Sequence, residues 1–266
     1  MNHPTDDPAT PAAISSDPAS HTLPTGADFA VLPRHIALIM DGNGRWARQQ
    51  GQPRLFGHQR GAEAARATMF ECARLGVEAL TLYSFSTENW KRPTEEVDFL
   101  MKLGHHYLQA EKQAIHERNL RFVHLGSPEG LPPQVVAELC DLQELTAGNT
   151  GMVIALALNY GSRREITEAA RTLARRVATG ELDAEQITED TLGAELDTAT
   201  LPDPDLLIRT AGEHRLSNFL LWQVSYAEMI FLEECWPDFT TAHLHAAIRE
   251  FGRRQRRFGD IDSAGG

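Results

Sequence analysis

One stretch, residues 36–51 with the sequence IALIMDGNGRWARQQG, constrains the fold of this chain more than any other. Its first five residues are apolar, as in a buried strand, and the apolar run ends at a single carboxylate, Asp41. Gly42 and Gly44 follow, and a helical pattern begins at Arg45. A strand, a glycine turn and a helix start form an anion site at the carboxyl edge of an α/β sheet, because free N–H groups and the helix dipole attract phosphate.

The same glycines also fit a second type of site. Gly42, Gly44 and Ala47 match the G-x-G-x-x-A fingerprint of dinucleotide-binding folds. That fingerprint needs an acidic residue about 20 positions further on, at the tip of the next strand, whereas Glu63 falls inside a helical pattern. Asp41 is better explained as a carboxylate that holds Mg²⁺ against a phosphate, since hard oxygen ligands suit this ion. We favour a diphosphate site with Mg²⁺ and keep a dinucleotide oxidoreductase as an alternative.

The rest of the chain alternates strand-like and helix-like segments. This alternation predicts one α/β domain, with a mostly parallel central sheet flanked by helices, over residues 33–258. Residues 1–32 are rich in Pro, Ala, Ser, Thr and Asp and lack hydrophobic periodicity, so we predict a disordered extension there. Residues 259–266 are predicted to form a flexible tail. The predicted strands span 36–40, 77–85, 120–125, 152–158 and 205–208, and the predicted helices span 59–75, 94–118, 132–146, 163–177, 184–196 and 239–258.

Composition argues against several classes of function. A formal charge of −12 disfavours nucleic acid as a partner. The 3 cysteines lie far apart and fit neither a disulfide framework nor a zinc site, which favours a reducing, cytoplasmic compartment. The longest apolar runs are far shorter than a membrane span. We therefore expect at most peripheral membrane contact.

Polar clusters follow four of the predicted strands, and a parallel sheet would bring them to one edge. No Ser-His-Asp order, nucleophile elbow or P-loop lysine accompanies them. Guanidinium groups bind diphosphate oxygens in a bidentate manner, and these polar clusters contain several arginines. Together with the long apolar stripe of the 94–118 helix, they predict a diphosphate substrate with an apolar tail. The arginines are Arg45, Arg54, Arg92, Arg209 and Arg215, and the carboxylates able to bind metal are Asp41 and Glu228.

Four segments in this order resemble the successive motifs of the cis-prenyltransferases: HIALIMDGNGRWA, LTLYSFSTENWKRP, NYGSRREI and DLLIRTAGEHRLSNFLLWQVSYAEM. The resemblance covers residues 33–258 and is closest to bacterial members that make undecaprenyl diphosphate. Ala211 stands where the family usually has Gly or Ser, and Ser162 where Gly is frequent. The resemblance implies a homodimeric, Mg²⁺-dependent enzyme that condenses isopentenyl diphosphate repeatedly onto farnesyl diphosphate in cis configuration. Its product would be the precursor of the glycosyl carrier lipid for peptidoglycan synthesis.

The resemblance also implies roles for individual residues. Asp41 would be the essential carboxylate that works with Mg²⁺, and Glu228 and His214 would join it as metal ligands. Asn89 is assigned to the proton-removal step, where we expect it to orient a diphosphate oxygen or a water. Gly42 to Arg45, with Arg54 and His58, would hold the allylic diphosphate. The implied substrate-binding residues are Gly42, Asn43, Gly44, Arg45, Trp46, Arg54, His58, Ser86, Thr87, Glu88, Trp90, Arg92, Arg209, Arg215, Leu216 and Ser217.

An apolar product tunnel along the 94–118 helix follows from the same reasoning. Val97, Leu100 and Leu103 are predicted to line it, Met152 to form its floor, and Gly104 to leave room for the growing chain. One alternative is a family member with a different product length, because tunnel volume and not motif sets this length. Another is a non-catalytic scaffold subunit of the same fold, which the intact motifs disfavour. A trans-type prenyltransferase is excluded because the chain has no D-D-x-x-D motif.

Overall fold

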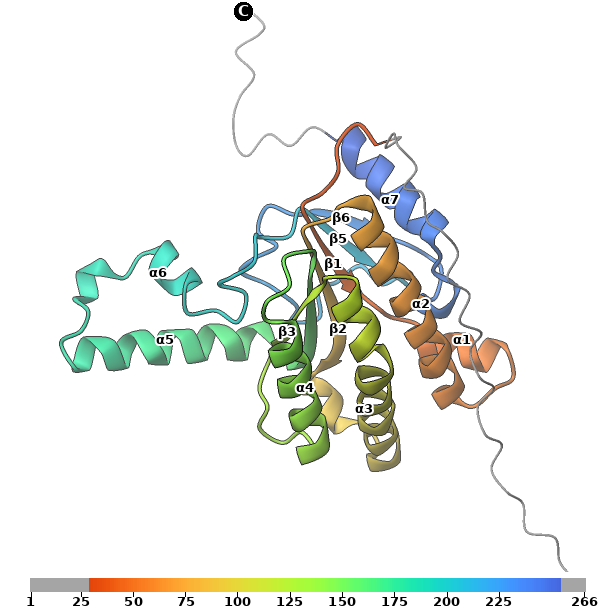
Figure 1. Ribbon diagram of the computed structural model, residues 1–266, viewed down its shortest axis with the longest axis horizontal. Helices are drawn as coiled ribbons and strands as arrows, with labels where there is room; N and C mark the ends of the chain where they lie inside the picture. The colour runs from red at the N-terminus through yellow and green to blue at the C-terminus, as the bar shows by residue number, and fades with distance from the viewer. Residues whose placement is uncertain (1–28, 255–266) are drawn as a thin grey trace, which may run out of the picture.

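The fold is built on one parallel sheet, in a computed structural model that describes residues 29–254 (Figure 1). The six strands are hydrogen-bonded in the order β3-β4-β2-β1-β5-β6, and every pair is parallel. The predicted single α/β domain is confirmed, and the sheet is fully rather than mostly parallel. The strands are β1 (His35–Ile39), β2 (Ala79–Ser86), β3 (Arg121–Leu125), β4 (Val153–Tyr160), β5 (Leu206–Arg209) and β6 (Glu228–Phe231).

Helices connect the strands, and most lie where the sequence predicts them. They are α1 (Asn43–Gln49), α2 (Arg54–Leu75), α3 (Thr94–Glu117), α4 (Pro133–Thr146), α5 (Ser162–Ala178), α6 (Glu189–Gly193) and α7 (Thr241–Arg253), with 3-10 turns η1 (Thr87–Lys91), η2 (Ala184–Gln186) and η3 (Trp236–Asp238). The predicted single helix over 184–196 is wrong. Asp183 caps η2 and Thr188 caps α6, so two short helices form. Residues 255–258 of the last predicted helix lie outside the described residues. Within residues 29–254, no helix is both long and apolar enough to cross a membrane.

Two apolar clusters sandwich the sheet because successive strand residues point to opposite faces. In β1, Ile36 and Leu38 join the cluster that α2, α3, α4 and α7 cover. Ala37 and Ile39 join the cluster on the other face, together with Phe219 from the irregular segment after β5. All four of these strand residues are buried, which explains why the strand reads as a continuous apolar run.

The N-terminal end of the described chain packs against the core. Phe29 and Leu32, inside the predicted 1–32 extension, pack against the helical face of the core, and the Phe29 ring meets His245 of α7 edge-on at 5.5 Å. The remaining residues of the extension, 1–28, and the predicted tail, 259–266, lie outside the described residues.

The α5 and α6 helices project as an arm from the side of the sheet (Figure 1).

Helix α2 begins earlier than predicted, so Gly57, which precedes the predicted helix, lies inside it. The predicted helix began at residue 59, whereas α2 begins at Arg54, directly after Pro53. A Cβ at Gly57 would lie 2.0 Å from the backbone oxygen of Asn43, and one at Gly61 would lie 2.1 Å from the Asn43 side-chain oxygen. The two glycines, one helical turn apart, therefore let α2 pack closely against the start of α1.

His35 makes the stability of this fold depend on pH. The ring is fully buried, with Nδ1 2.6 Å from the carbonyl oxygen of Pro202 and Nε2 2.8 Å from the Thr81 hydroxyl. Burial lowers the pKa of His35 to about 4, against an opposing contribution from the Pro202 hydrogen bond. Between pH 6.5 and 4 the unfolded chain therefore binds more protons at this site than the folded chain, so folding stability falls as the pH falls.

We expect the loss at His35 to be on the order of 3 kcal/mol by pH 4. Urea unfolding across this pH range should give a flatter stability profile for His35→Gln than for the wild type, whatever its stability at pH 7. His106→Gln, at an exposed position of α3, is the control and should keep the wild-type profile. Equal slopes for His35→Gln and the wild type would contradict the assignment.

Candidate active site

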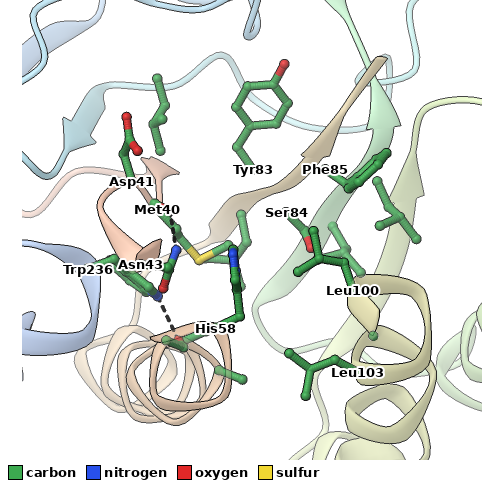
Figure 2. A pocket seen from close by; sticks show the side chains of 18 of the residues that line it. Met40, Asp41, Asn43, His58, Tyr83, Ser84, Phe85, Leu100, Leu103 and Trp236 are labelled. Carbon is green, nitrogen blue, oxygen red and sulfur yellow. Dashed lines mark hydrogen bonds between the residues drawn. The ribbon is translucent and has the colours of Figure 1, made fainter. Parts of the chain in front are cut away.

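A cavity of about 590 Å³ opens at the carboxyl edge of the sheet and runs between the sheet, α2 and α3. Figure 2 shows its walls, with His58 of α2 on one side, Leu100 and Leu103 of α3 on another, and Asp41 at the strand tip. The cavity has a polar end at the strand tips and an apolar end along α3. It brings together these predicted site residues: Asp41, Gly42, Asn43, Gly44, Arg45, Arg54, His58, Ser86, Asn89, Arg92, Arg209, Arg215 and Ser217.

Asp41 lies at the centre of the polar end, held from both sides. One carboxylate oxygen accepts a 2.7 Å bond from the Gly42 N–H, and the other accepts a 2.8 Å bond from Nη2 of Arg209. The backbone of Asp41 is fixed as well, since its N–H and C=O both bond to the hydroxyl of buried Thr210. The carboxylate is 36% exposed, and it therefore keeps a free side toward the cavity.

Arg209 is the buried cation of the site. Its side chain is 3% exposed and, besides Asp41, it donates to the backbone oxygen of Arg215 and, at 2.8 Å, to the hydroxyl of Ser217. Its Nε is buried with no partner in residues 29–254. The guanidinium thus ties the tip of β1 to the loop after β5 and fixes the geometry of that loop.

Two further carboxylates hold the other arginines in place. Glu213 accepts from Arg45 at 2.7 Å and from Arg215. Hydrogen bonds from these two arginines, that from Arg215 first, lower the pKa of Glu213. Glu96 of α3 lies 3.2 Å from both Arg54 and Arg92. Arginines from four different segments are therefore already turned toward one space, which reduces the reorganisation that an anionic ligand would require.

His58 is neutral in this arrangement. Its Nε2 is buried without a hydrogen-bond partner in the described residues, and it lies 3.9 Å from Glu96. Burial lowers the pKa of His58 to about 4, and the nearby Arg92 and Arg54 add to this effect against Glu96. A neutral imidazole with one unused nitrogen can donate or accept a single hydrogen bond in the cavity.

The amide of Asn89 presents a donor to the cavity. Its Oδ1 accepts a 3.1 Å bond from the Ser86 N–H, as part of the capping box of η1. Its Nδ2 makes no hydrogen bond within residues 29–254. An N–H₂ group cannot accept a proton, which argues against a role as base, and the orienting role stays a prediction.

The apolar end of the cavity extends along most of α3. Leu100, Leu103 and Gly104 line it, as predicted, and a Cβ at Gly104 would meet no atom within 4 Å. Ile115, near the end of the helix, lines it as well, so the cavity follows about 22 Å of helix. Two further predicted positions, Val97 and Met152, belong to the buried core and are not in its wall. Ile154 takes the place expected for Met152 on β4.

Five of the predicted substrate-binding and metal-binding residues lie beside the cavity rather than in its wall: Trp46, Thr87, Trp90, His214 and Leu216. Trp46 donates to Asp238 at 2.7 Å and stacks on Phe56. Trp90 donates to Asn159 at 2.8 Å, and His214 stacks on Phe231 with 4.8 Å between ring centroids. These side chains can support the residues of the wall. Their contact with a bound substrate stays a prediction.

Two further predicted residues, Glu228 and Glu88, are also absent from the cavity wall. Glu228 begins β6 and is in register with the first residue of β5, about 10 Å from the level of Arg209. It is paired at 2.8 Å with Arg254. Glu88 bonds to Asn218 at 2.9 Å instead of lining the cavity. Within one chain, the structure therefore does not bring Glu228 to Asp41.

Sequence reasoning did not identify Glu96, Glu213 and Thr210 as parts of the site. Glu213 lies inside a motif whose basic and hydroxyl residues make up the predicted site. Glu96 fits the pattern of an ordinary acid in the first turn of α3, where it complements the helix dipole. The available signal was an excess of arginines at the strand tips, since several cations crowded together need carboxylates between them.

Comparisons with known proteins agree with this geometry. Residues 39–259 match the Prenyltransf family model, which describes undecaprenyl diphosphate synthases. A Vibrio vulnificus protein named ditrans,polycis-undecaprenyl-diphosphate synthase ((2E,6E)-farnesyl-diphosphate specific) is 50% identical over 228 residues, covering 86% of this chain and 91% of that protein. An isoprenyl transferase of Shouchella clausii is 47% identical over 238 residues, covering 90% of this chain and 93% of that protein. The crystal structure of lavandulyl diphosphate synthase from Lavandula x intermedia, in complex with dimethylallyl diphosphate, has a TM-score of 0.85 at 36% identity, covering 86% and 99%.

Proposed function

This chain belongs to the undecaprenyl diphosphate synthase family of prenyltransferases, and we propose that it condenses isopentenyl diphosphate repeatedly onto farnesyl diphosphate in cis configuration to make undecaprenyl diphosphate. The observation that carries the proposal is the two-ended cavity. Its polar end gathers Asp41 and the cavity arginines, and its apolar end follows α3. A diphosphate with a long hydrocarbon tail matches both ends at once.

The arginines of the polar end suit the two diphosphate groups of such a reaction. The new bond forms between the allylic carbon of one substrate and the terminal alkene carbon of the other, while the allylic C–O bond breaks and a proton is lost. Charge builds on the leaving diphosphate, and fixed guanidinium groups stabilise it. We place the allylic diphosphate against residues 42–45, Arg54 and His58, and isopentenyl diphosphate against Arg209, Arg215 and Ser217. Asn89, by donating, would orient a diphosphate oxygen or a water.

The site fits Mg²⁺ that is bound jointly by protein and substrate. Among the described residues no group of three or more His, Cys, Asp or Glu side chains could hold a metal. Mg²⁺ is commonly held by one or two carboxylates plus substrate phosphates and water, and Asp41 offers an exposed carboxylate beside the arginines. The ion would supply Lewis-acid stabilisation of the diphosphate when bound. Asp41 would hold it, and Glu228 of the same chain would not.

Product length offers a test of the apolar end. Leu100→Trp places a large ring in the cavity wall beside the growing tail, so we expect the products to become shorter while the first condensation keeps a similar rate. Chromatography of labelled products by chain length measures both effects. Leu145→Trp, at an exposed site on α4, is the matched control and should leave the product length unchanged. An unchanged length in Leu100→Trp would show that this wall does not limit the tail.

We also propose that the enzyme is a cytoplasmic homodimer with at most peripheral membrane contact, and that its product serves peptidoglycan synthesis as the precursor of the carrier lipid. Free cysteines at positions 72, 140 and 235 support a reducing compartment. Edge strand β6 and the neighbouring Tyr226, which is 72% exposed, support an interface between copies. Light scattering during gel filtration tests the dimer, and a monomeric mass would refute it.

A further inference from the structure

Three segments at the carboxyl edge of the sheet meet at Asn218, a residue to which the resemblance assigns no role. Its backbone oxygen accepts a 2.9 Å bond from Ser162 N–H, and its Oδ1 accepts a 2.9 Å bond from Arg163 N–H. Its Nδ2 donates to Oε1 of Glu88 at 2.9 Å. One side chain thus links the loop after β5, the start of α5 and the 3-10 turn η1.

The chemistry of these partners fixes the orientation of the amide. A backbone N–H can only donate, so the atom facing Arg163 must be the amide oxygen, and the amide nitrogen then faces the Glu88 carboxylate. Partial burial raises the pKa of Glu88, but hydrogen bonds, that from Asn218 foremost, outweigh this effect and lower it overall. Glu88 is therefore an ionised acceptor at neutral pH, and the Asn218–Glu88 bond is charge-assisted.

The sequence neighbours of this pair are cavity residues. Glu88 precedes Asn89, and Asn218 follows Ser217, and both neighbours line the polar end of the cavity. The segments that carry Thr87, Gly161 and Asn218 are closely packed. A Cβ at Gly161 would lie 2.6 Å from the Thr87 hydroxyl and 2.8 Å from Nδ2 of Asn218. The backbone is constrained at this point as well, because Ser217 and Asn218 adopt left-handed conformations with φ of 52° and 62°.

We propose that Asn218 is a positioning residue, which sets the separation between Asn89 and Ser217 through its bond to Glu88. This inference rests on the proposed function, in which those two residues serve different parts of one reaction. Glu88 then contributes through Asn218 and not by touching substrate. Because a displacement of about 1 Å in a reacting geometry can cost on the order of 10²-fold in rate, one hydrogen bond of this kind has a measurable effect on turnover.

The test is a double-mutant cycle that reverses the polarity of the bond. Asn218→Asp keeps the size of the side chain, tolerates the left-handed backbone and still accepts from Arg163, but it sets a carboxylate against Glu88. In the double variant Asn218→Asp/Glu88→Gln, the new amide can donate to the new carboxylate. We expect Asn218→Asp to lower kcat at least tenfold in the wild-type background, and to cost less than about threefold in the Glu88→Gln background.

Two further measurements separate positioning from general destabilisation and from failure of the proposed function. The thermal midpoints of all four proteins should agree within a few degrees. Hydrogen exchange in residues 86–92 should rise in Asn218→Asp and return in the double variant. Equal costs of Asn218→Asp in both backgrounds would overturn the inference. If the wild type itself fails to condense the two diphosphates, the proposed function fails, and the exchange cycle alone then decides whether Asn218 positions η1.

Discussion

Asp41→Asn is expected to lower turnover by about 10²- to 10³-fold while leaving the protein folded. The substitution removes the charge that faces the diphosphates but keeps an oxygen that can accept from the Gly42 N–H or from Arg209. Alanine at this position is a poorer test, because it also leaves the buried Arg209 guanidinium without its side-chain acceptor at this position, which destabilises the native state. Steady-state kinetics at saturating substrates, with a thermal midpoint for each variant, measure the effect.

Asp238→Asn is the matched control for Asp41→Asn. Asp238 is another carboxylate close to the β1–α1 loop, where it accepts from Trp46, but it is not in the cavity wall. We expect this variant to stay within a few-fold of wild-type turnover. Near-normal turnover of Asp41→Asn would contradict the assigned role, and so would equal losses in the two variants.

Arg209→Lys is expected to lower kcat/KM for isopentenyl diphosphate at least 10²-fold, although the charge is kept. The buried guanidinium reaches Asp41, Ser217 and the backbone of Arg215 from one planar fork. A lysine ammonium is a point charge that cannot span these partners, so the loop after β5 would lose its fixed position. The measurement is kcat and KM with each substrate varied in turn, alongside thermal unfolding.

Arg215→Lys provides the comparison, because it makes the same change at an exposed arginine of the same cavity. Its side chain is 59% exposed and, through its guanidinium, pairs with Glu213. A lysine can maintain such a pair, so a loss of about tenfold or less is expected. If Arg215→Lys were the more damaging of the two, burial would not be what makes Arg209 important.

Much of this architecture could be predicted from local sequence patterns. Continuous apolar runs identify five of the six strands, because both faces of the sheet are covered, whereas the short edge strand β6 is not predicted. The glycine loop after β1 could be placed because a buried run stops there at Asp41. Gly57 falls outside the predicted helix, because glycine is typical both of turns and of close helix contacts. Only the approach of α2 to within 2.0 Å of the Asn43 oxygen, measured from the missing Cβ, distinguishes them.

The parts of the site that escaped prediction depend on contacts distant in sequence. The Asp41–Arg209 pair spans 168 positions and the Asn218–Glu88 bond spans 130. A carboxylate among apolar residues suggests a metal, which groups Glu228 with Asp41 in the sequence. In the structure, Glu228 lies at the opposite edge of the sheet and pairs with Arg254 from the end of α7. Strand register, which the motif does not reveal, decides this point.

The most direct test of the central claim is incubation of the purified protein with farnesyl diphosphate, labelled isopentenyl diphosphate and Mg²⁺, with products separated by chain length. We predict a ladder of cis-polyprenyl diphosphates that ends at the undecaprenyl length and disappears when EDTA is added. Incorporation that ends at another length would keep the chemistry and correct the product. No incorporation from farnesyl diphosphate or any other allylic primer would contradict the account and favour a non-catalytic subunit of the same fold.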